Sequence, residues 1–178
     1  MKKIILINGV IAGLIISGIM LISVGFIDNG TLNFDNGMLV GYASMVLGFS
    51  MIFVGIKTYR DQVLKGVITF GQACKAGLLI ALVASVLYAI SWEIYYNVAA
   101  QDFTQKYTEH YLQKMKSGGA SEEEISSKRT EMESFNQLYE NPFIRFGVTL
   151  LEILPVGVIV TVLSAAILRK REVFSAVP

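Results

Sequence analysis

Residues that build common catalytic and metal sites are scarce in this sequence of 178 residues. There is one cysteine, Cys74, and one histidine, His110, so the chain lacks an internal disulfide and a Cys/His set of the kind that holds zinc. No glycine-rich phosphate loop follows a strand pattern, and no H-E-x-x-H motif is present. We therefore expect no metal, no cofactor and no enzymatic activity.

Charged residues are also scarce. They make up 16% of the chain, whereas 53% is hydrophobic, and this balance is too apolar for a water-soluble domain. Part of the surface must therefore face the lipid bilayer. The net charge of +1 gives no reason to expect a nucleic-acid partner.

Four apolar runs are long enough to cross a membrane, which takes roughly 20 residues. The first run exceeds the roughly 7 to 15 apolar residues of a signal peptide, so we interpret it as a helix that stays in the membrane. The predicted spans cover residues 4–27, 38–56, 74–95 and 143–168. The expected fold class is all-α, a four-span transmembrane helical bundle within a single domain, 1–178.

Small side chains recur every fourth residue within the spans, as Gly9, Gly13 and Ser17 show in the first one. Such a spacing lets the backbones of two helices approach closely. The alternative is that glycine is simply abundant in membrane helices. Ala73, Gly77, Ala81 and Ser85 repeat the pattern in the third span.

Basic residues mark one end of the spans. The segment 57–75, between the second and third spans, contains four of them, whereas the loop 28–37 contains no Lys or Arg. Because short cytoplasmic segments are rich in Lys and Arg, we expect both termini and segment 57–75 to lie inside the cell. Residues 97–141 then lie outside.

The polar segment 97–141 reads as two helices separated by the turn at Gly118 and Gly119. Ser121 and Glu124 have the spacing of a capping box, which begins a helix. Each arm carries a face of large apolar residues, and we expect the two faces to pack together in an extramembrane helical hairpin between spans 3 and 4. These faces are Phe103, Tyr107 and Tyr111 in the first arm, and Ile125, Met132, Phe135 and Tyr139 in the second.

Three ionisable residues stand in or beside the spans. Glu93 and Arg145 are both near the outer interface, where we expect an ion pair between the third and fourth spans. Glu152 lies about 15 Å further along the helix from Pro142, at 1.5 Å per residue. We expect it to be protonated and to point into the bundle, either as a structural hydrogen-bonding group or as a proton relay. Pro155 lacks an amide hydrogen and predicts a helix kink.

Residues of another kind are predicted to anchor the helices at the membrane surface. Aromatic rings and charged groups at the ends of a span typically lie among the lipid head groups. The predicted interfacial anchors are Tyr59, Arg60 and Asp61 after the second span and Trp92 near the end of the third.

Four sequence blocks together resemble an uncharacterised bacterial membrane family, the one catalogued as domain of unknown function 4199. They are GYASMVLGFSMIFVGIKTYRD, ITFGQACKAGLL, SWEIYYN and NPFIRFGVTLLEILPVG. The resemblance covers nearly the whole chain and implies a multi-pass protein of the bacterial inner membrane. With the orientation expected from the basic residues, the termini are then cytoplasmic and hairpin 97–141 is periplasmic. The family has no established activity, ligand or catalytic residue, so the resemblance implies no mechanism.

Two functions remain open. The first is a structural or protein-interaction role, in which hairpin 97–141 contacts a protein partner or forms a homo-oligomer. The alternative is a small proton-linked transporter or permeation unit, which would act as an oligomer because one four-span chain is small for a translocation path. An enzyme acting on lipid within the membrane is the weakest reading, because no nucleophile with a base is apparent.

Overall fold

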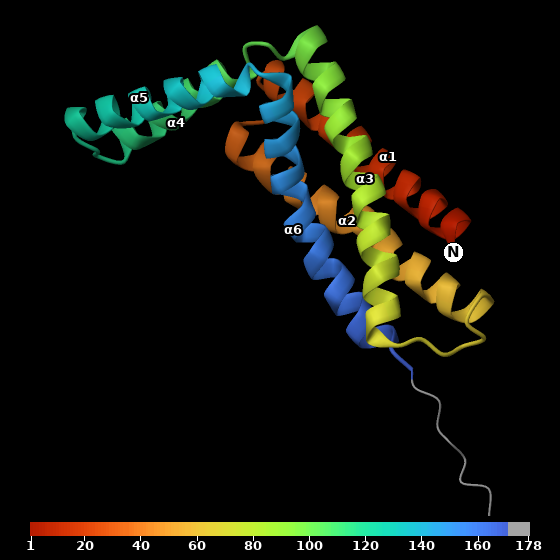
Figure 1. Ribbon diagram of the computed structural model, residues 1–178. Helices are drawn as coiled ribbons and strands as arrows, with labels where there is room; N and C mark the ends of the chain where they lie inside the picture. The colour runs from red at the N-terminus through yellow and green to blue at the C-terminus, as the bar shows by residue number, and fades with distance from the viewer. Residues whose placement is uncertain (171–178) are drawn as a thin grey trace, which may run out of the picture.

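The computed structural model describes residues 1–170, which form six α-helices (Figure 1). Helices α1, α2, α3 and α6 are long and apolar enough to cross a membrane, and α4 and α5 form a hairpin between α3 and α6 (Figure 1). The all-α, four-span fold class is therefore confirmed. The bounds are α1 Lys2–Asp28, α2 Phe34–Gln62, α3 Phe70–Ala99, α4 Phe103–Ser117, α5 Glu122–Tyr139 and α6 Pro142–Leu168.

The helix starts agree with the capping residues in the sequence. At α3, the Thr69 side chain accepts a hydrogen bond from the backbone N–H of Gln72, and Gln72 completes a capping box. Ser121 and Glu124 do the same for α5, and Asn141 caps α6 with Pro142 in the first turn. Because polar caps continue the helices beyond their apolar stretches, α2 and α3 are longer than the spans predicted for them.

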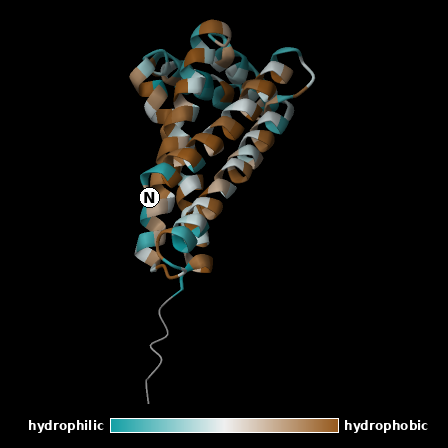
Figure 2. Cartoon of the chain, turned by 90° about the vertical axis from the view of Figure 1, so that its right-hand side faces the viewer, coloured by the Kyte–Doolittle hydropathy of each residue, from teal (hydrophilic) through white to brown (hydrophobic). Residues whose placement is uncertain are grey.

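Small residues let the spanning helices pack closely. A Cβ atom at Gly9 of α1 would lie 2.7 Å from the Val83 side chain of α3, and one at Gly157 of α6 would lie 2.9 Å from Ala81 of α3. The close packing predicted from the small-residue spacing is therefore present. Helix α3 contacts α1, α2 and α6, and α2 also contacts α1 and α6. Most of the length of the spanning helices consists of apolar residues (Figure 2).

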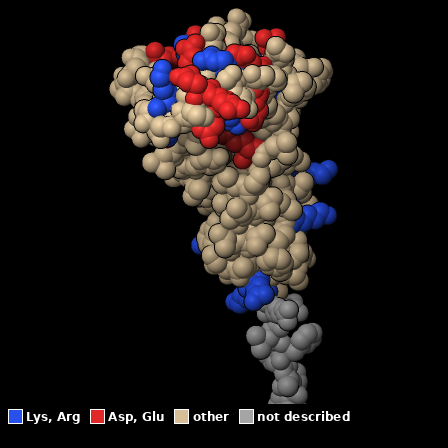
Figure 3. Space-filling view, turned by 90° about the vertical axis from the view of Figure 1, so that its left-hand side faces the viewer, with Lys and Arg blue, Asp and Glu red and all other residues tan. Residues whose placement is uncertain are grey.

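The two ends of the bundle carry different charges. On the face shown in Figure 3, acidic side chains gather at the hairpin end together with some basic ones, whereas the charged side chains visible at the opposite end are all Lys or Arg. At that opposite end Ile68 and Lys170 exchange backbone hydrogen bonds of 3.1 and 3.0 Å, which hold the connection between α2 and α3 against the end of α6. The hairpin projects to one side of the bundle, on the side of α2 (Figure 1).

Candidate functional site

Glu93 and Arg145 form a two-point ion pair between α3 and α6. Arg145 donates from Nε to Oε1 of Glu93 at 2.8 Å and from Nη2 to Oε2 at 2.7 Å. This planar, bidentate geometry is the strong form of an arginine–carboxylate pair. Arg145 is only 2% exposed, so the pairing expected from the sequence is present and shielded from water.

Arg145 also holds the end of the hairpin. Its Nη1 donates to the backbone oxygens of Tyr139 at 3.1 Å and Glu140 at 3.4 Å. The guanidinium lies 3.9 Å from the centre of the Tyr96 ring, a favourable cation–π geometry. One side chain thus connects α3, the end of α5 and the start of α6, which fixes how the hairpin leaves the bundle.

Trp92 requires a correction. The sequence pattern predicts that Trp92 is an interfacial anchor. In the structure the residue is only 7% exposed and packs inside the protein. Its indole Nε1 donates a hydrogen bond of 2.8 Å to the hydroxyl of Tyr139, and its ring meets Phe103 edge-on at 5.1 Å between centroids. The residue therefore attaches the hairpin to α3 and does not contact lipid head groups.

Charged pairs that were not predicted from the sequence join α4 to the last residue of α1 and to the first turn of α2. Lys106 contacts Asp28 at 3.2 Å, and Lys114 contacts Asp35 at 2.8 Å. The hydrogen bonds that Lys106 donates to Asp102 and Asp28 raise its pKa above the ordinary value. A signal was present, since loop 28–37 is acidic without any Lys or Arg and lysines recur along α4.

Phe34 is the apolar centre of this contact. Its ring lies 5.6 Å from Phe103, 5.7 Å from Tyr107 and 5.3 Å from His110, measured between centroids. His110 is half-buried here, with Nε2 3.7 Å from a carboxylate oxygen of Asp35. The first arm of the hairpin is therefore packed on the bundle.

The two aromatic faces of the hairpin do not close on each other as expected. The arms touch through Thr108 and Asn136, whose side chains are joined by a 3.1 Å hydrogen bond. The large apolar residues line an open groove of about 610 Å³ between α4 and α5. Phe103, Tyr107 and Tyr139 line both this groove and a second cavity inside the bundle.

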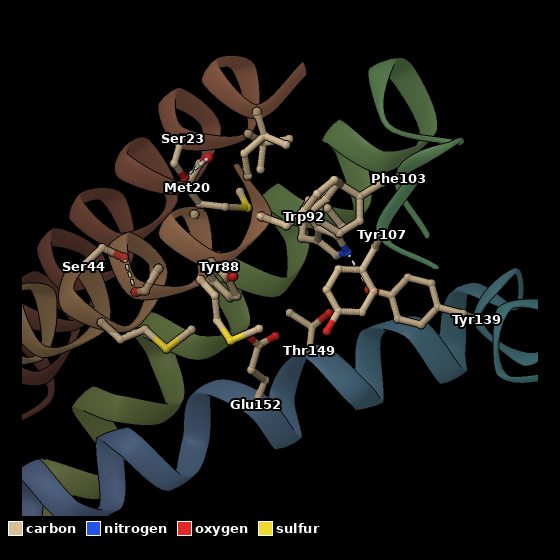
Figure 4. Close-up of a pocket in the computed structure, with 17 residues that line it drawn as sticks. Met20, Ser23, Ser44, Tyr88, Trp92, Phe103, Tyr107, Tyr139, Thr149 and Glu152 are labelled. Carbon is tan, nitrogen blue, oxygen red and sulfur yellow. Dashed lines mark hydrogen bonds between the residues drawn. The ribbon is translucent and has the colours of Figure 1, made fainter. Parts of the chain in front are cut away.

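This bundle cavity has a volume of about 290 Å³ and lies where the hairpin joins the bundle (Figure 4). Its wall consists of residues from α1, α2, α3 and α6 together with the three hairpin residues just named. It exists because α2 carries small residues here. A Cβ atom at Gly41 would meet nothing within 4 Å, and Ser44 turns its hydroxyl to the Gly41 carbonyl of its own helix at 2.7 Å. Further along α2, a Cβ atom at Gly48 would collide with Ile16 of α1. Helix α2 is therefore in close contact with α1 at Gly48, whereas it leaves open space at Gly41.

Glu152 projects into this cavity, on the side facing Tyr88 (Figure 4). We expected Glu152 to point into the bundle near the small residues of another span. Small residues of α2 do line the cavity with it, namely Gly37, Gly41 and Ser44. The expected hydrogen bond to a neighbouring helix is absent, since no partner within residues 1–170 contacts the carboxyl group. The side chain remains exposed at the opening of the cavity.

The other predicted residues lie away from the cavity. Arg60 donates to the neighbouring Asp61 at 2.6 Å and to the Leu168 backbone oxygen at 3.4 Å, while Tyr59 packs against the core. Helix α6 continues through Pro155 to Leu168, and the kink remains a prediction. Within residues 1–170, no group of three or more His, Cys, Asp and Glu residues could hold a metal ion.

Four long apolar helices with a polar hairpin at one end define a multi-pass helical membrane protein. The sequence profile of the family described as "Protein of unknown function (DUF4199)" matches residues 7–170. The chain belongs to this family. No curated protein and no solved structure matches the chain.

Proposed function

We propose that this is a non-enzymatic membrane protein whose hairpin, α4 and α5, is a protein-interaction module. The observation that carries the proposal is that α5 is firmly attached at one end but has no buried residue along its 18 residues. Phe135 is 46% exposed and Leu138 57% exposed. A helix that is held in place while its large apolar side chains stay uncovered is suited to contact another protein.

A second copy of the chain is the partner that we propose. A two-fold axis would pair the same apolar strip, Phe135 and Leu138, with itself, as in most homodimers. Acidic and basic side chains alternate nearby, as in the pair between Lys128 and Glu131 at 2.8 Å, so like copies need not repel each other. In this proposal the hairpin lies in the periplasm of a bacterium and the basic end of the bundle lies in the cytoplasm, which the charge distribution supports.

A photo-crosslinking amino acid at position 138 tests this proposal in living cells. Position 133 is the matched control, because Glu133 is also exposed but lies on another face of α5. We expect a crosslinked band of twice the chain's mass at position 138 and little at 133. A band of another mass would identify a different protein partner, and lipid adducts alone at both positions would contradict the proposal.

A second function, proton-linked movement of a small molecule through an oligomer, is favoured by one observation. Glu152 faces a cavity and has no hydrogen-bond partner in the described part of the chain, whereas a structural acid in a membrane helix is normally paired. Purified protein in liposomes that contain a pH-sensitive dye would report proton movement. Loss of that signal in Glu152→Gln would support the transporter, and a signal equal to that of empty liposomes would exclude it.

A further inference from the structure

The bundle cavity has a one-sided electrostatic character. Among the residues that line it, Glu152 is the one that carries a full charge when ionised, and there is no Lys, Arg or His. Arg145, the one basic residue of the same helix α6, already makes a bidentate pair with Glu93 and does not line the cavity. A carboxylate in such a site therefore has no cation supplied by the described chain.

Aromatic and sulfur-containing side chains form much of the remaining wall. Aromatic rings attract cations to their faces, and methionines adapt their shape to different ligands. The negative faces of the same rings repel anions. The six aromatic residues are Phe34, Tyr88, Trp92, Phe103, Tyr107 and Tyr139, and the three methionines are Met20, Met38 and Met45.

The opening of the cavity decides where a ligand enters. The most exposed residues of the wall are Met38 on α2, which is 50% exposed, and Glu152 on α6. Both belong to membrane-spanning helices. When these helices span the membrane, an opening between the two residues faces the bilayer, and a ligand dissolved in lipid has a route to Glu152.

We infer that this cavity binds a lipophilic organic cation, a quaternary ammonium or phosphonium ion with apolar substituents, taken from the bilayer. The ion's charge pairs with the Glu152 carboxylate, and its substituents contact the aromatic wall. A volume of about 290 Å³ is at the small end of ligand pockets, which fits one compact ion. The inference concerns binding alone and does not depend on the hairpin's role in protein interaction.

Trp92 provides the measurement. It is the single tryptophan of the chain and lines the cavity, so its fluorescence reports on a ligand there. The full-length protein in lipid nanodiscs would be titrated with tetraphenylphosphonium. We expect a saturable change in emission. The anion tetraphenylborate, which has the same shape and the opposite charge, should produce no saturable change.

The decisive variant is Glu152→Gln, which keeps the shape and removes the charge. We expect it to weaken binding about tenfold or more, because the coulombic attraction of two opposite charges about 5 Å apart is worth more than that factor even at an effective dielectric constant of about 20. Glu152→Asp should retain part of the affinity. The control is Glu140→Gln, an exposed acid outside the cavity wall, which should bind like the original protein.

Two results would overturn the inference. One is equal affinity of the original protein and Glu152→Gln for tetraphenylphosphonium, and the other is saturable binding of tetraphenylborate with the same affinity. An unchanged thermal unfolding temperature in Glu152→Gln establishes that the variant is folded. Crosslinking at position 138 is read separately, so failure of either proposal leaves the other intact.

Discussion

The indole nitrogen of Trp92 lies 2.8 Å from the hydroxyl oxygen of Tyr139, to which it donates a hydrogen bond. The two residues are 47 positions apart in the sequence, one on α3 and the other at the last residue of α5. This bond attaches the returning arm of the hairpin to the bundle at the upper wall of the cavity. The first prediction follows from removing its acceptor.

Tyr139→Phe should loosen the hairpin. It leaves the buried indole N–H without a partner, which costs about 1–3 kcal/mol, so hydrogen exchange in α5 should become faster and the Trp92 emission should shift. Tyr111→Phe is the matched control, because this tyrosine lines the groove and no hydrogen bond of its hydroxyl is seen in residues 1–170. Equal exchange rates in the two variants would contradict the role of the bond.

Separating Glu93 from Arg145 should be costly. Glu93→Gln or Arg145→Ala leaves a charge without its partner in a shielded site, and such losses are about 3–5 kcal/mol. The exchange Glu93→Arg with Arg145→Glu should recover only part of the stability. Arg145 also contacts two backbone oxygens and Tyr96, and a glutamate cannot replace those contacts. Thermal unfolding followed by Trp92 fluorescence compares the exchange with Glu93→Arg and Arg145→Glu made singly, and strictly additive losses in the exchanged protein would argue against coupling.

Membrane orientation can be tested with single cysteines in a Cys74→Ser background. Positions 33, 65 and 121 are all exposed in the structure, so accessibility in the folded protein does not bias the comparison. We expect a membrane-impermeant thiol reagent to label Asn33→Cys and Ser121→Cys in intact spheroplasts, and to label Lys65→Cys only after lysis. Labelling at position 65 in intact spheroplasts would reverse the proposed orientation.

The start of α5 should respond to acid. Hydrogen bonds from the backbone N–H and hydroxyl of Ser121 lower the pKa of Glu124. A group whose pKa is lowered on folding stabilises the folded state above its unfolded-state pKa, and this contribution is lost as the pH falls through the folded-state value. Protection of the first turn of α5 from hydrogen exchange, corrected for intrinsic rates, should therefore decrease below about pH 4. Glu124→Gln keeps the capping geometry and should remove that pH dependence.

Glycines on α2 should respond to substitution according to their place in the bundle. Gly48→Ala adds a Cβ atom that would lie 2.9 Å from the Ala12 backbone oxygen and collide with Ile16, so we expect a loss of about 1–3 kcal/mol. Gly41→Ala adds the same group into open space beside the cavity and should be tolerated. Thermal unfolding distinguishes them, and equal losses would show that the cavity is closed in the membrane.

Local features of the fold could be predicted from the sequence. Apolar run length fixes the four spans, and the caps at Thr69, Ser121 and Asn141 depend on residues at most three positions away. The pairing of Glu93 with Arg145 was also predictable, because two opposite charges near the same end of adjacent spans have few other partners.

Tertiary structure alone decided three features. These are the packing of α4 on segment 28–37, the open groove of the hairpin and the cavity around Glu152. An apolar strip on a helix has the same sequence whichever surface it meets, so Phe103 and Tyr107 gave no sign that they pack on Phe34. Likewise, a run of small residues on α2 permits close contact at Gly48 and a cavity at Gly41. The outcome depends on the side chains that the other helices bring opposite each position, and helix-by-helix patterns do not contain that information.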